Sequence, residues 1–342
     1  MTTQIIFQRF FNLGRFCACL CLFVFSSTFC LAGQSVPISH PAVKDFVTYM
    51  VDQHQYNKKE LEQVFSQTHF RTDVLKLISA PASAISWDNY RKRFVNARHI
   101  KNGVDFWNKY ADKLAQAKKI YGVPEEIIVA IIGIETAYGT STGVHRVMDS
   151  LTTLAFNFPR RADYFREELA QYLLLAREQG FNLLAIKGSY AGAIGIAQFM
   201  PGSYRRYAVD FDHDGKIDLM SNVADAIGSV GNYLKEFGWE AGKPIVTRAQ
   251  IKSAESENFQ KFLEADIEPI HTVKALRSAG IVPLDPVPDD TSSALLELNS
   301  HGKRQFWFGF KNFYVITRYN RSTFYAMSVF ELAKALRIAK SV

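Results

Sequence analysis

An apolar segment near the middle of the chain constrains the fold more than any other feature. Residues 127–134 are eight consecutive residues without a polar side chain. Pro124, Glu125 and Glu126 precede them. This order is typical of a helix start, because proline at the first position loses no hydrogen bond and acidic residues suit the positive end of the helix dipole. Gly139 is the expected cap at the other end. A helix that is apolar on nearly all sides belongs in a core, so we predict a helical fold built around it.

Glu135 follows this apolar segment directly. A carboxylate near the C-terminal end of a buried helix is disfavoured twice, because burial removes water from the charged form and the helix dipole is negative there. Both effects raise its pKa, which is what a general acid at neutral pH requires. The alternatives are that Glu135 faces solvent at the helix end or pairs with an arginine.

A glycine-rich stretch over residues 187–201 is a second candidate for function. It holds three glycines from Gly188 to Gly195, and glycine lets the backbone approach a ligand or another element closely. Ser189 and Gln198 can hydrogen-bond neutral hydroxyl or acetamido groups. The alternative is tight packing between helices.

Apolar residues at helical spacing indicate helices from about residue 41 to about residue 238. Three stripes carry this prediction: Val43, Phe46, Val47 and Met50; Phe106, Tyr110, Leu114 and Ala117; and Phe165, Leu169, Tyr172, Leu173 and Ala176. Gly122 is expected to end the helix of the second stripe, and Pro81 to separate two early helices.

From residue 243 the pattern changes to short strand-like runs with prolines between them. The runs are 244–247, 271–274, 294–298 and 305–316. Within the last run, 305–310 and 313–316 are expected to form a buried hairpin. A helix from about 322 to 339 is expected to return to the helical part. The predicted fold class is therefore mainly α (α+β), with a small antiparallel β part.

The beginning of the sequence is typical of an export signal. Arg9 and Arg15 stand before an apolar run over residues 16–29, and small residues precede a cut after Ala32. The run is shorter than the roughly 20 residues of a membrane-spanning helix, so a cleavable signal peptide over 1–32 is favoured over an uncleaved anchor. Lipidation is possible but not favoured, because bulky Phe29 interrupts the residue pattern expected before Cys30.

Composition excludes several classes of protein. All four cysteines lie in the first 30 residues, which rules out a disulfide-stapled fold and a cysteine-ligated zinc site in the rest of the chain. The net charge of +7 suits an anionic partner. Nucleotide-binding glycine motifs are missing from the sequence, and the arginine clusters at 91–93 and 160–161 are typical of solvated helix faces. We therefore expect no nucleic-acid partner.

Residues 210–218 fit the first nine positions of an EF-hand calcium loop. Aspartates alternate so that their oxygens converge on one ion, and Gly215 stands where the loop must turn sharply. The expected ligands are Asp210, Asp212, Asp214 and the main-chain carbonyl of Lys216. Position 12 is Ser221, so the usual bidentate glutamate is missing. The sequence predicts a structural Ca²⁺ site, the alternative being an Asx-rich turn without metal.

Residues 132–136 and 188–201 together resemble the signature of the soluble and membrane-bound lytic murein transglycosylases of the B type, the glycoside hydrolase family 103 type. The similarity continues in matching order through residues 158–161, 224–230 and 319–322. It spans the chain from about residue 85 to about residue 335.

The resemblance implies a lysozyme-like helical core with an additional α domain and a small antiparallel β domain. The corresponding divisions are a signal peptide (1–32), an N-terminal α domain (33–115), a catalytic core with the EF-hand-like loop (116–241), a β domain (242–316) and a C-terminal segment that returns to the core or the α domain (317–342). It also implies cleavage of the β-1,4 bond between N-acetylmuramic acid and N-acetylglucosamine, with a 1,6-anhydromuramic product. Glu135 is then the acid that protonates the leaving oxygen and afterwards the base that takes the proton of the C6 hydroxyl.

Further positions that match the family line its sugar cleft. They are Ser189, Gln198, Tyr233, Tyr319, Asn320 and Tyr325, with Tyr90 as an additional match. Arg160 and Arg161 are candidates to meet stem-peptide carboxylates. Asp225 is the later aspartate that the resemblance suggests for closing the calcium site.

Two other functions remain as alternatives. A hydrolytic muramidase needs a second carboxylate, for which Asp149, Asp163 and Glu167 are candidates on charge alone. A non-catalytic peptidoglycan-binding protein has no need of an acid in an apolar helix. We expect a periplasmic monomer without an organic cofactor, and outer-membrane association is left open. The expected partners are peptidoglycan strands and proteins of cell-wall synthesis or remodelling.

Overall fold

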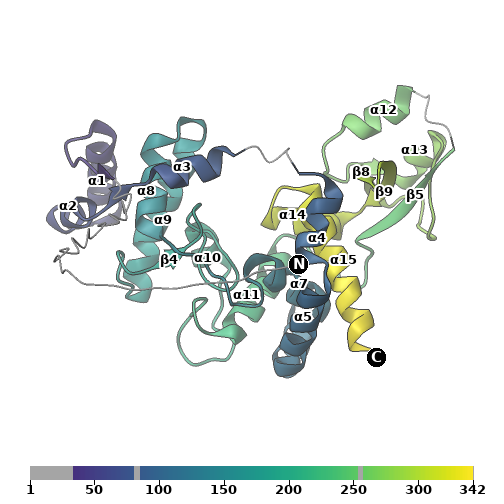
Figure 1. Ribbon diagram of the computed structural model, residues 1–342, viewed down its shortest axis with the longest axis horizontal. Helices are drawn as coiled ribbons and strands as arrows, with labels where there is room; N and C mark the ends of the chain where they lie inside the picture. The colour runs from purple at the N-terminus through teal and green to yellow at the C-terminus, as the bar shows by residue number, and fades with distance from the viewer. Residues whose placement is uncertain (1–33, 81–84, 253–256, 342) are drawn as a thin grey trace, which may run out of the picture. The chain divides into compact units, whose positions relative to one another are not determined.

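The computed structural model of the protein describes residues 34–80, 85–252 and 257–341 (Figure 1). The predicted signal peptide and the predicted break at Pro81 lie outside these residues. In the described part, no helix combines the length and the apolar character that a bilayer crossing requires.

Helices form most of the chain up to residue 236. They are α1 (Pro41–His54), α2 (Lys58–Ser66), α3 (Thr72–Ser79), α4 (Trp87–Phe94), α5 (Ala97–Lys109), α6 (Ala111–Tyr121), α7 (Glu125–Thr136), α8 (Val147–Asn157), the 3₁₀ helix η2 (Pro159–Arg161), α9 (Ala162–Gln179), α10 (Pro201–Tyr207) and α11 (Val223–Glu236). Short antiparallel pairs join β1 (Gln34–Ser35) to β2 (His69–Phe70) and β3 (His145–Arg146) to β4 (Lys187–Gly188).

The apolar helix α7 lies in the main core, as predicted. Its residues from Ile127 to Ile132 are buried, and the helix packs against α5, α6, α11 and α15. The stripes on α1 and α9 are buried as well. One detail differs: Pro124 is the residue before the helix, with extended ψ of 141°, rather than its first residue.

The second predicted stripe is divided between two helices. α5 and α6 meet at Tyr110, whose φ of −116° and ψ of 26° leave the helical range. Phe106 and Leu114 are still buried. Because both helices turn the same face to the core, periodicity does not reveal the break. Gly122 ends α6 with a left-handed φ of 71°, as predicted.

The end of α7 is a strained turn, and the prediction of Gly139 as its cap is wrong. Ala137 is the C-cap, and Ala137, Tyr138 and Gly139 have φ values of 47°, 64° and 85°. The ring of Tyr138 fills a slot between two helices. A Cβ at Gly133 would come within 2.6 Å of this ring, and one at Gly103 within 2.4 Å of its hydroxyl. The slot therefore holds the turn in a conformation that residues other than glycine rarely adopt.

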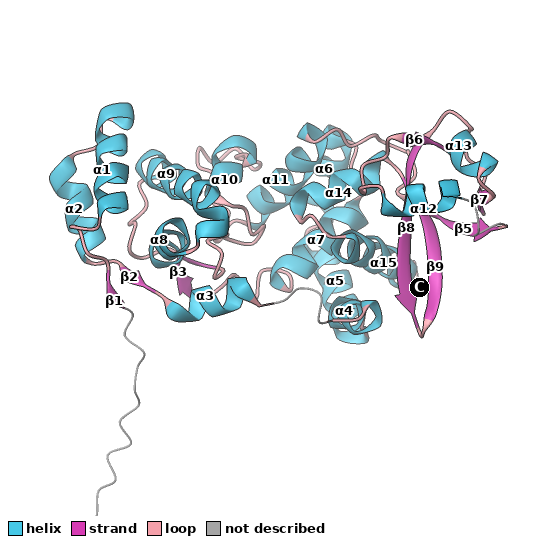
Figure 2. Ribbon diagram, turned by 90° about the horizontal axis from the view of Figure 1, so that it is seen from above, coloured by secondary structure: helices cyan, strands magenta, loops and turns pink. Residues whose placement is uncertain are grey.

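The C-terminal part contains the antiparallel sheet that the sequence predicts. Its strands are β5 (Val246–Ile251), β6 (His271–Thr272), β7 (Ile281–Pro283), β8 (Ser292–Ser300) and β9 (Lys303–Gly309), in the order β6-β8-β9-β5-β7. The helices α12 (Glu257–Glu264) and α13 (Val273–Ser278) contact this sheet (Figure 2). A second, smaller apolar cluster lies here, around Phe259, Leu276 and Phe308. The division of the chain into domains stays a prediction.

The predicted hairpin within 305–316 is wrong. β9 ends at Gly309, and residues 313–316 belong to α14 (Lys311–Tyr319). β9 pairs instead with β8, and His301 and Gly302 form the turn with φ values of 51° and 73°. Aromatic and β-branched residues favour a strand locally. Burial of Phe313 and Ile316 in the main core decides for the helix.

Two other strand predictions need smaller corrections. The run 271–274 is a strand only to Thr272, whose hydroxyl accepts the N–H of Ala275 and so starts α13. The run 244–247 enters the sheet only at Val246. The predicted final helix is α15 (Thr323–Lys340), capped by Ser322, and it packs against α7 and α5.

Candidate active site

Glu135 lies in the last turn of α7 and meets a tyrosine of α15. The hydroxyl of Tyr325 donates a hydrogen bond of 2.6 Å to Oε1 of Glu135. Burial raises the pKa of Glu135 to about 7, and the hydrogen bond from Tyr325 acts in the opposite direction. Part of the Glu135 side chain remains exposed. The predicted rise in pKa is confirmed, and Glu135 is an acid poised near neutrality that solvent or a ligand can reach.

Three tyrosines predicted for the sugar cleft form one aromatic cluster beside this acid. The rings of Tyr319 and Tyr325 are stacked at 6.4 Å with an angle of 14°. Tyr233 lies 4.8 Å from Tyr319, measured between ring centroids. Burial and the nearby Glu135 charge raise the pKa of Tyr319 and of Tyr325 well above the ordinary value. The cluster therefore stays neutral. Tyr233 and Tyr325 are buried, and Tyr319 is partly exposed beside the acid.

Two hydroxyls of this cluster bind main-chain carbonyls. Tyr319 donates to the oxygen of Ala197 at 2.7 Å, and Tyr233 donates to that of Arg318 at 2.7 Å. These bonds fix the rings and the glycine-rich stretch relative to each other. Their phenolic oxygens keep only acceptor capacity for a ligand.

Tyr90 also lies near the acid, and Asn320 follows the cluster residue Tyr319 in sequence. Tyr90 lies on α4, its ring packs 5.8 Å from that of Phe324, and its pKa is raised by burial and by the charge of Glu135. Asn320 is the exposed residue that ends α14, directly after Tyr319. The structure thus brings residues from α4, α7, α14 and α15 together.

The glycine-rich stretch is held against the end of α7. The hydroxyl of Thr136 donates to the oxygen of Ile196 at 2.9 Å and accepts the N–H of Gly139 at 3.0 Å. Backbones approach so closely here that a Cβ at Gly143 would lie 2.1 Å from the carbonyl of Gly188. Thr136 was not predicted as a functional residue, and only its place beside Glu135 in the motif could have suggested it.

Ser189 and Gln198 stabilise this stretch internally. The Ser189 hydroxyl accepts the N–H of Ala193 at 3.0 Å. Gln198 has a left-handed φ of 49°, and its amide donates to the oxygens of Thr142 and Gly195 at 2.9 Å each. The amide oxygen of Gln198 and the hydroxyl hydrogen of Ser189 remain for a ligand.

The two arginines predicted to meet stem peptides lie on η2, and their interactions do not reach Glu135. The Arg161 guanidinium lies over the rings of Tyr164 and Phe165, at 4.3 and 5.2 Å. Arg160 is exposed. Neither arginine has a contact with the acid–tyrosine cluster, which is formed by Glu135, Tyr233, Tyr319 and Tyr325. The role of the arginines stays a prediction.

The three carboxylates weighed for a second acid are engaged elsewhere. Asp149 is buried and accepts hydrogen bonds from Arg146 and from the N–H of His69. Asp163 pairs with Arg166. Glu167 accepts a hydrogen bond from the amide of Gln171.

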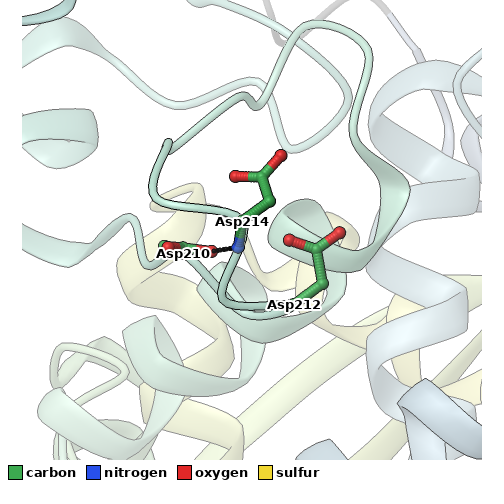
Figure 3. A group of neighbouring side chains, drawn as sticks. All are labelled: Asp210, Asp212 and Asp214. Carbon is green, nitrogen blue, oxygen red and sulfur yellow. Dashed lines mark hydrogen bonds between the residues drawn. The ribbon is translucent and has the colours of Figure 1, made fainter.

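The loop after α10 gathers the aspartates predicted to bind calcium (Figure 3). One oxygen from each of Asp210, Asp212 and Asp214 lies within 4.8 Å of the others. Asp210 accepts the N–H groups of Asp214 and Gly215 at 3.1 and 2.8 Å, and Gly215 makes the sharp turn with φ 88°. Converging carboxylates are the hard oxygen ligands that Ca²⁺ prefers, so the donor set fits this ion.

Asp225 holds this loop from α11. Its two oxygens accept the N–H groups of Phe211 and Asp218, each at 2.8 Å. Asp225 is fully buried. The carboxylate therefore shapes the loop directly, and each oxygen keeps one lone pair that could meet an ion.

A partly buried acid beside a tyrosine cluster and a glycine-rich loop, on a mainly helical fold, is the arrangement expected of a glycan-cleaving enzyme of the lysozyme-like class. Residues 39–334 match the family model described as a transglycosylase SLT domain. The chain is 41% identical over 312 residues to the membrane-bound lytic murein transglycosylase B of Escherichia coli K12, covering 88% of this chain and 84% of that protein. The chain therefore belongs to the lytic murein transglycosylases, as its motifs predict.

Solved structures of relatives agree. The soluble lytic transglycosylase SltB1 of Pseudomonas aeruginosa matches with a TM-score of 0.82 and 44% identity, over 88% of this chain and 100% of that chain. The Escherichia coli lytic transglycosylase Slt35 in complex with calcium matches with a TM-score of 0.82 and 40% identity, over 92% and 99% of the two chains. The predicted fold class is confirmed, and the protein is a peptidoglycan lytic transglycosylase, which cleaves glycan strands without hydrolysis.

Proposed function

We propose that Glu135 performs both proton transfers of the reaction. In the first step neutral Glu135 protonates the oxygen that leaves C1 of N-acetylmuramic acid, and the glycosidic bond breaks. In the second step the resulting carboxylate takes the proton of the C6 hydroxyl of the same sugar, whose oxygen bonds to C1. The acid returns to its starting state, and the products are a free 4-hydroxyl and a 1,6-anhydro end.

The hydrogen bond between Tyr325 and Glu135 is the observation that carries this proposal. Because the Tyr325 hydroxyl donates to Oε1, the proton of neutral Glu135 belongs on Oε2. A pKa of about 7 lets the same group give a proton and take one back near neutral pH. Attack by a hydroxyl of the same sugar has a high effective concentration, so a second carboxylate is not needed to activate a nucleophile.

The surrounding side chains are proposed to hold the sugars. The partly exposed rings of Tyr90 and Tyr319 suit the apolar faces of sugars. Tyr233 is buried and would support the ring of Tyr319 from behind. The free acceptor and donor capacity of Gln198, Ser189 and Asn320 suits hydroxyl and acetamido groups. Arg160 and Arg161 would meet carboxylates of the peptide side chains.

Mass spectrometry of digested peptidoglycan tests the role of Glu135. The unchanged protein should release anhydromuramyl products, and Glu135→Gln should release about 10²- to 10⁴-fold less. Asp163→Asn is a matched control, because Asp163 is an exposed acid that pairs with Arg166, and it should behave as the unchanged protein. Anhydromuramyl products from Glu135→Gln at an undiminished rate would overturn the assignment.

We also propose that Ca²⁺ occupies the loop over residues 210–225, where it would neutralise the carboxylates and stiffen the start of α11. Asp210, Asp212, Asp214 and the Lys216 carbonyl are the proposed ligands, and Asp225 closes the site. The calcium complex of Slt35 supports this proposal. The N-terminal signal pattern supports export to the periplasm, and the membrane-bound relative supports attachment to a membrane there.

A further inference from the structure

A cavity lies between the sheet and the helical core. Its volume is about 890 Å³, and its walls come from the 240–244 link, the 286–292 loop, Glu268, Pro269 and the start of α14. None of the residues assigned above to catalysis, sugar binding or calcium lines it. A cavity of this size is within the range of ligand-binding sites in proteins.

Charges of both signs line this cavity. They are the carboxylates of Glu240, Glu268 and Asp290 and the ammonium groups of Lys243 and Lys311. Elsewhere in the described chain carboxylates such as Glu178 and Glu297 pair with arginines. The five charges in the cavity form no ion pair with any residue that the structure describes. A ligand that carries both carboxylates and an amine would complement them.

The rest of the wall is stiff and partly apolar. Four prolines contribute to it, at positions 244, 269, 286 and 288, together with Phe310 and Tyr314. The link is fastened to α14 by Asn312, which is buried, accepts the N–H of Glu240 and donates to the oxygens of Glu240 and Lys243 at 2.8 and 3.0 Å. The cavity is therefore formed before a ligand arrives, which reduces the cost of binding.

Helix α14 connects this cavity to the cluster of Glu135, Tyr233, Tyr319 and Tyr325. Tyr314 lines the cavity, and the Arg318 guanidinium lies 4.0 Å from its ring centroid. The main-chain carbonyl of Arg318 accepts the hydrogen bond of the Tyr233 hydroxyl at 2.7 Å. Tyr314 and Tyr319 lie on the same helix, about 7.5 Å apart along its axis.

We propose that this cavity binds the stem peptide of the peptidoglycan strand that occupies the sugar cleft. This proposal rests on the proposed function. Stem peptides are short chains with free carboxylates and, where uncrosslinked, a free amine, which is the charge combination that the wall offers. The lysines receive the carboxylates, the acids receive the amine, and Tyr314 with Arg318 spans the gap to the sugar. The site would favour strands that still carry peptides.

Two substrates separate this proposal from the proposed function. Glycan strands with intact stem peptides and strands stripped of peptide are digested in parallel, and kcat/KM is measured for each from anhydromuramyl products. The ratio of the two values should exceed one for the unchanged protein. In the double variant Glu268→Gln/Lys311→Gln the ratio should fall by about twofold to fivefold for each charge removed.

A matched control and a binding measurement complete the experiment. Glu264→Gln/Lys334→Gln removes an exposed acid and an exposed lysine outside the cavity, and the ratio should stay as in the unchanged protein.

Isothermal titration of the protein with the free stem tetrapeptide should give heat that Glu268→Gln/Lys311→Gln abolishes. An equal ratio in all three proteins, or titration heat that survives in Glu268→Gln/Lys311→Gln, would overturn the peptide site. Failure to make anhydromuramyl ends from either substrate would instead contradict the proposed function.

Discussion

Tyr325 and Glu135 are 190 residues apart in the chain, yet the tyrosine hydroxyl lies 2.6 Å from Oε1 of the acid. The hydrogen bond favours the carboxylate form, while burial favours the protonated form and prevails. The pKa of Glu135 is therefore set near 7 by two opposing effects, burial and the hydrogen bond from Tyr325, and each can be altered separately.

Tyr325→Phe should move the pH dependence of cleavage upward. Removing the hydroxyl removes the contact that lowers the pKa of Glu135, so the acid stays protonated to a higher pH. The alkaline fall of kcat/KM, expected near pH 7 in the unchanged protein, should shift to higher pH, and the maximum should drop about tenfold for the lost hydrogen bond. The measurement is kcat/KM on purified glycan strands between pH 5 and about pH 9.

Tyr319→Phe is the comparison for that experiment. Its hydroxyl donates to the carbonyl of Ala197 and not to Glu135, so the alkaline fall should keep its position. A shift of equal size in both variants would show that the hydrogen bond to Glu135 is not the cause.

Glu135→Gln should stabilise the fold at pH 8 and have little effect at pH 4. The pKa of the carboxyl is about 7 in the folded protein, against an ordinary value of 4.5. Ionisation in the folded state is therefore unfavourable: the penalty is absent below pH 4.5, grows between 4.5 and about 7, and is complete above that. At pH 8 it amounts to at most about 3 kcal/mol, since part of the side chain is exposed.

Thermal unfolding of the two proteins at both pH values measures this effect. The gain in Tm from Glu135→Gln should be several degrees larger at pH 8 than at pH 4. Glu264→Gln, on the exposed side of α12, should give the same change at both. A larger gain at pH 4 would have the wrong sign for a buried acid.

Chelation of calcium should lower Tm by about 5 °C if the ion is present at a hundred times its dissociation constant. Without the ion, the neighbouring carboxylates of Asp210, Asp212 and Asp214 repel one another. Asp212→Asn should remove most of the difference between calcium-containing and chelated samples. Identical melting curves in both samples of the unchanged protein would speak against a bound ion.

Asp225→Asn should behave differently from Asp212→Asn. Both oxygens of Asp225 accept main-chain N–H groups, and an asparagine would turn an NH₂ toward one of them. The variant should therefore lose about 2 kcal/mol of stability even in chelator. A Tm that changes only in calcium would assign Asp225 to the ion alone.

Gly133→Ala should impair the site through Tyr138. The added Cβ would approach the Tyr138 ring to 2.6 Å, with the strained turn after Glu135 attached to it. We expect a loss of about 2 kcal/mol of stability and a fall in kcat greater than any change in KM. Gly302→Ala, where the added Cβ meets nothing within 4 Å at a φ of +73°, controls for the loss of a glycine. Unchanged kcat in Gly133→Ala would show that the slot does not position the acid.

The sequence predicts the parts of the site that are local. The apolar run before Glu135 predicts a buried helix, and burial raises the pKa of Glu135. The aspartates at alternate positions with Gly215 predict the loop that the structure shows. The motif resemblance added the tyrosines, which no periodicity indicates.

Contacts over long distances in the chain could not be predicted. Nothing in the pattern around Tyr325 shows that its hydroxyl reaches Glu135, because that contact depends on how α15 packs on α7. Residues 313–316 have strand-forming side chains, and only the core that receives Phe313 makes them helical. The left-handed Ala137 and Tyr138 likewise depend on Gly103, more than thirty residues earlier in the chain.

The packing of α15 on α7 also sets the moment at which a newly made chain can work. A ribosome adding about 5–20 residues per second needs roughly 10–40 s to proceed from Glu135 to Tyr325. During that interval the acid exists without the hydroxyl that tunes it and without the helix that covers it. A chain released in that interval carries Glu135 but no tyrosine partner from α15. The active site therefore cannot assemble until Tyr325 and the rest of α15 have been synthesised.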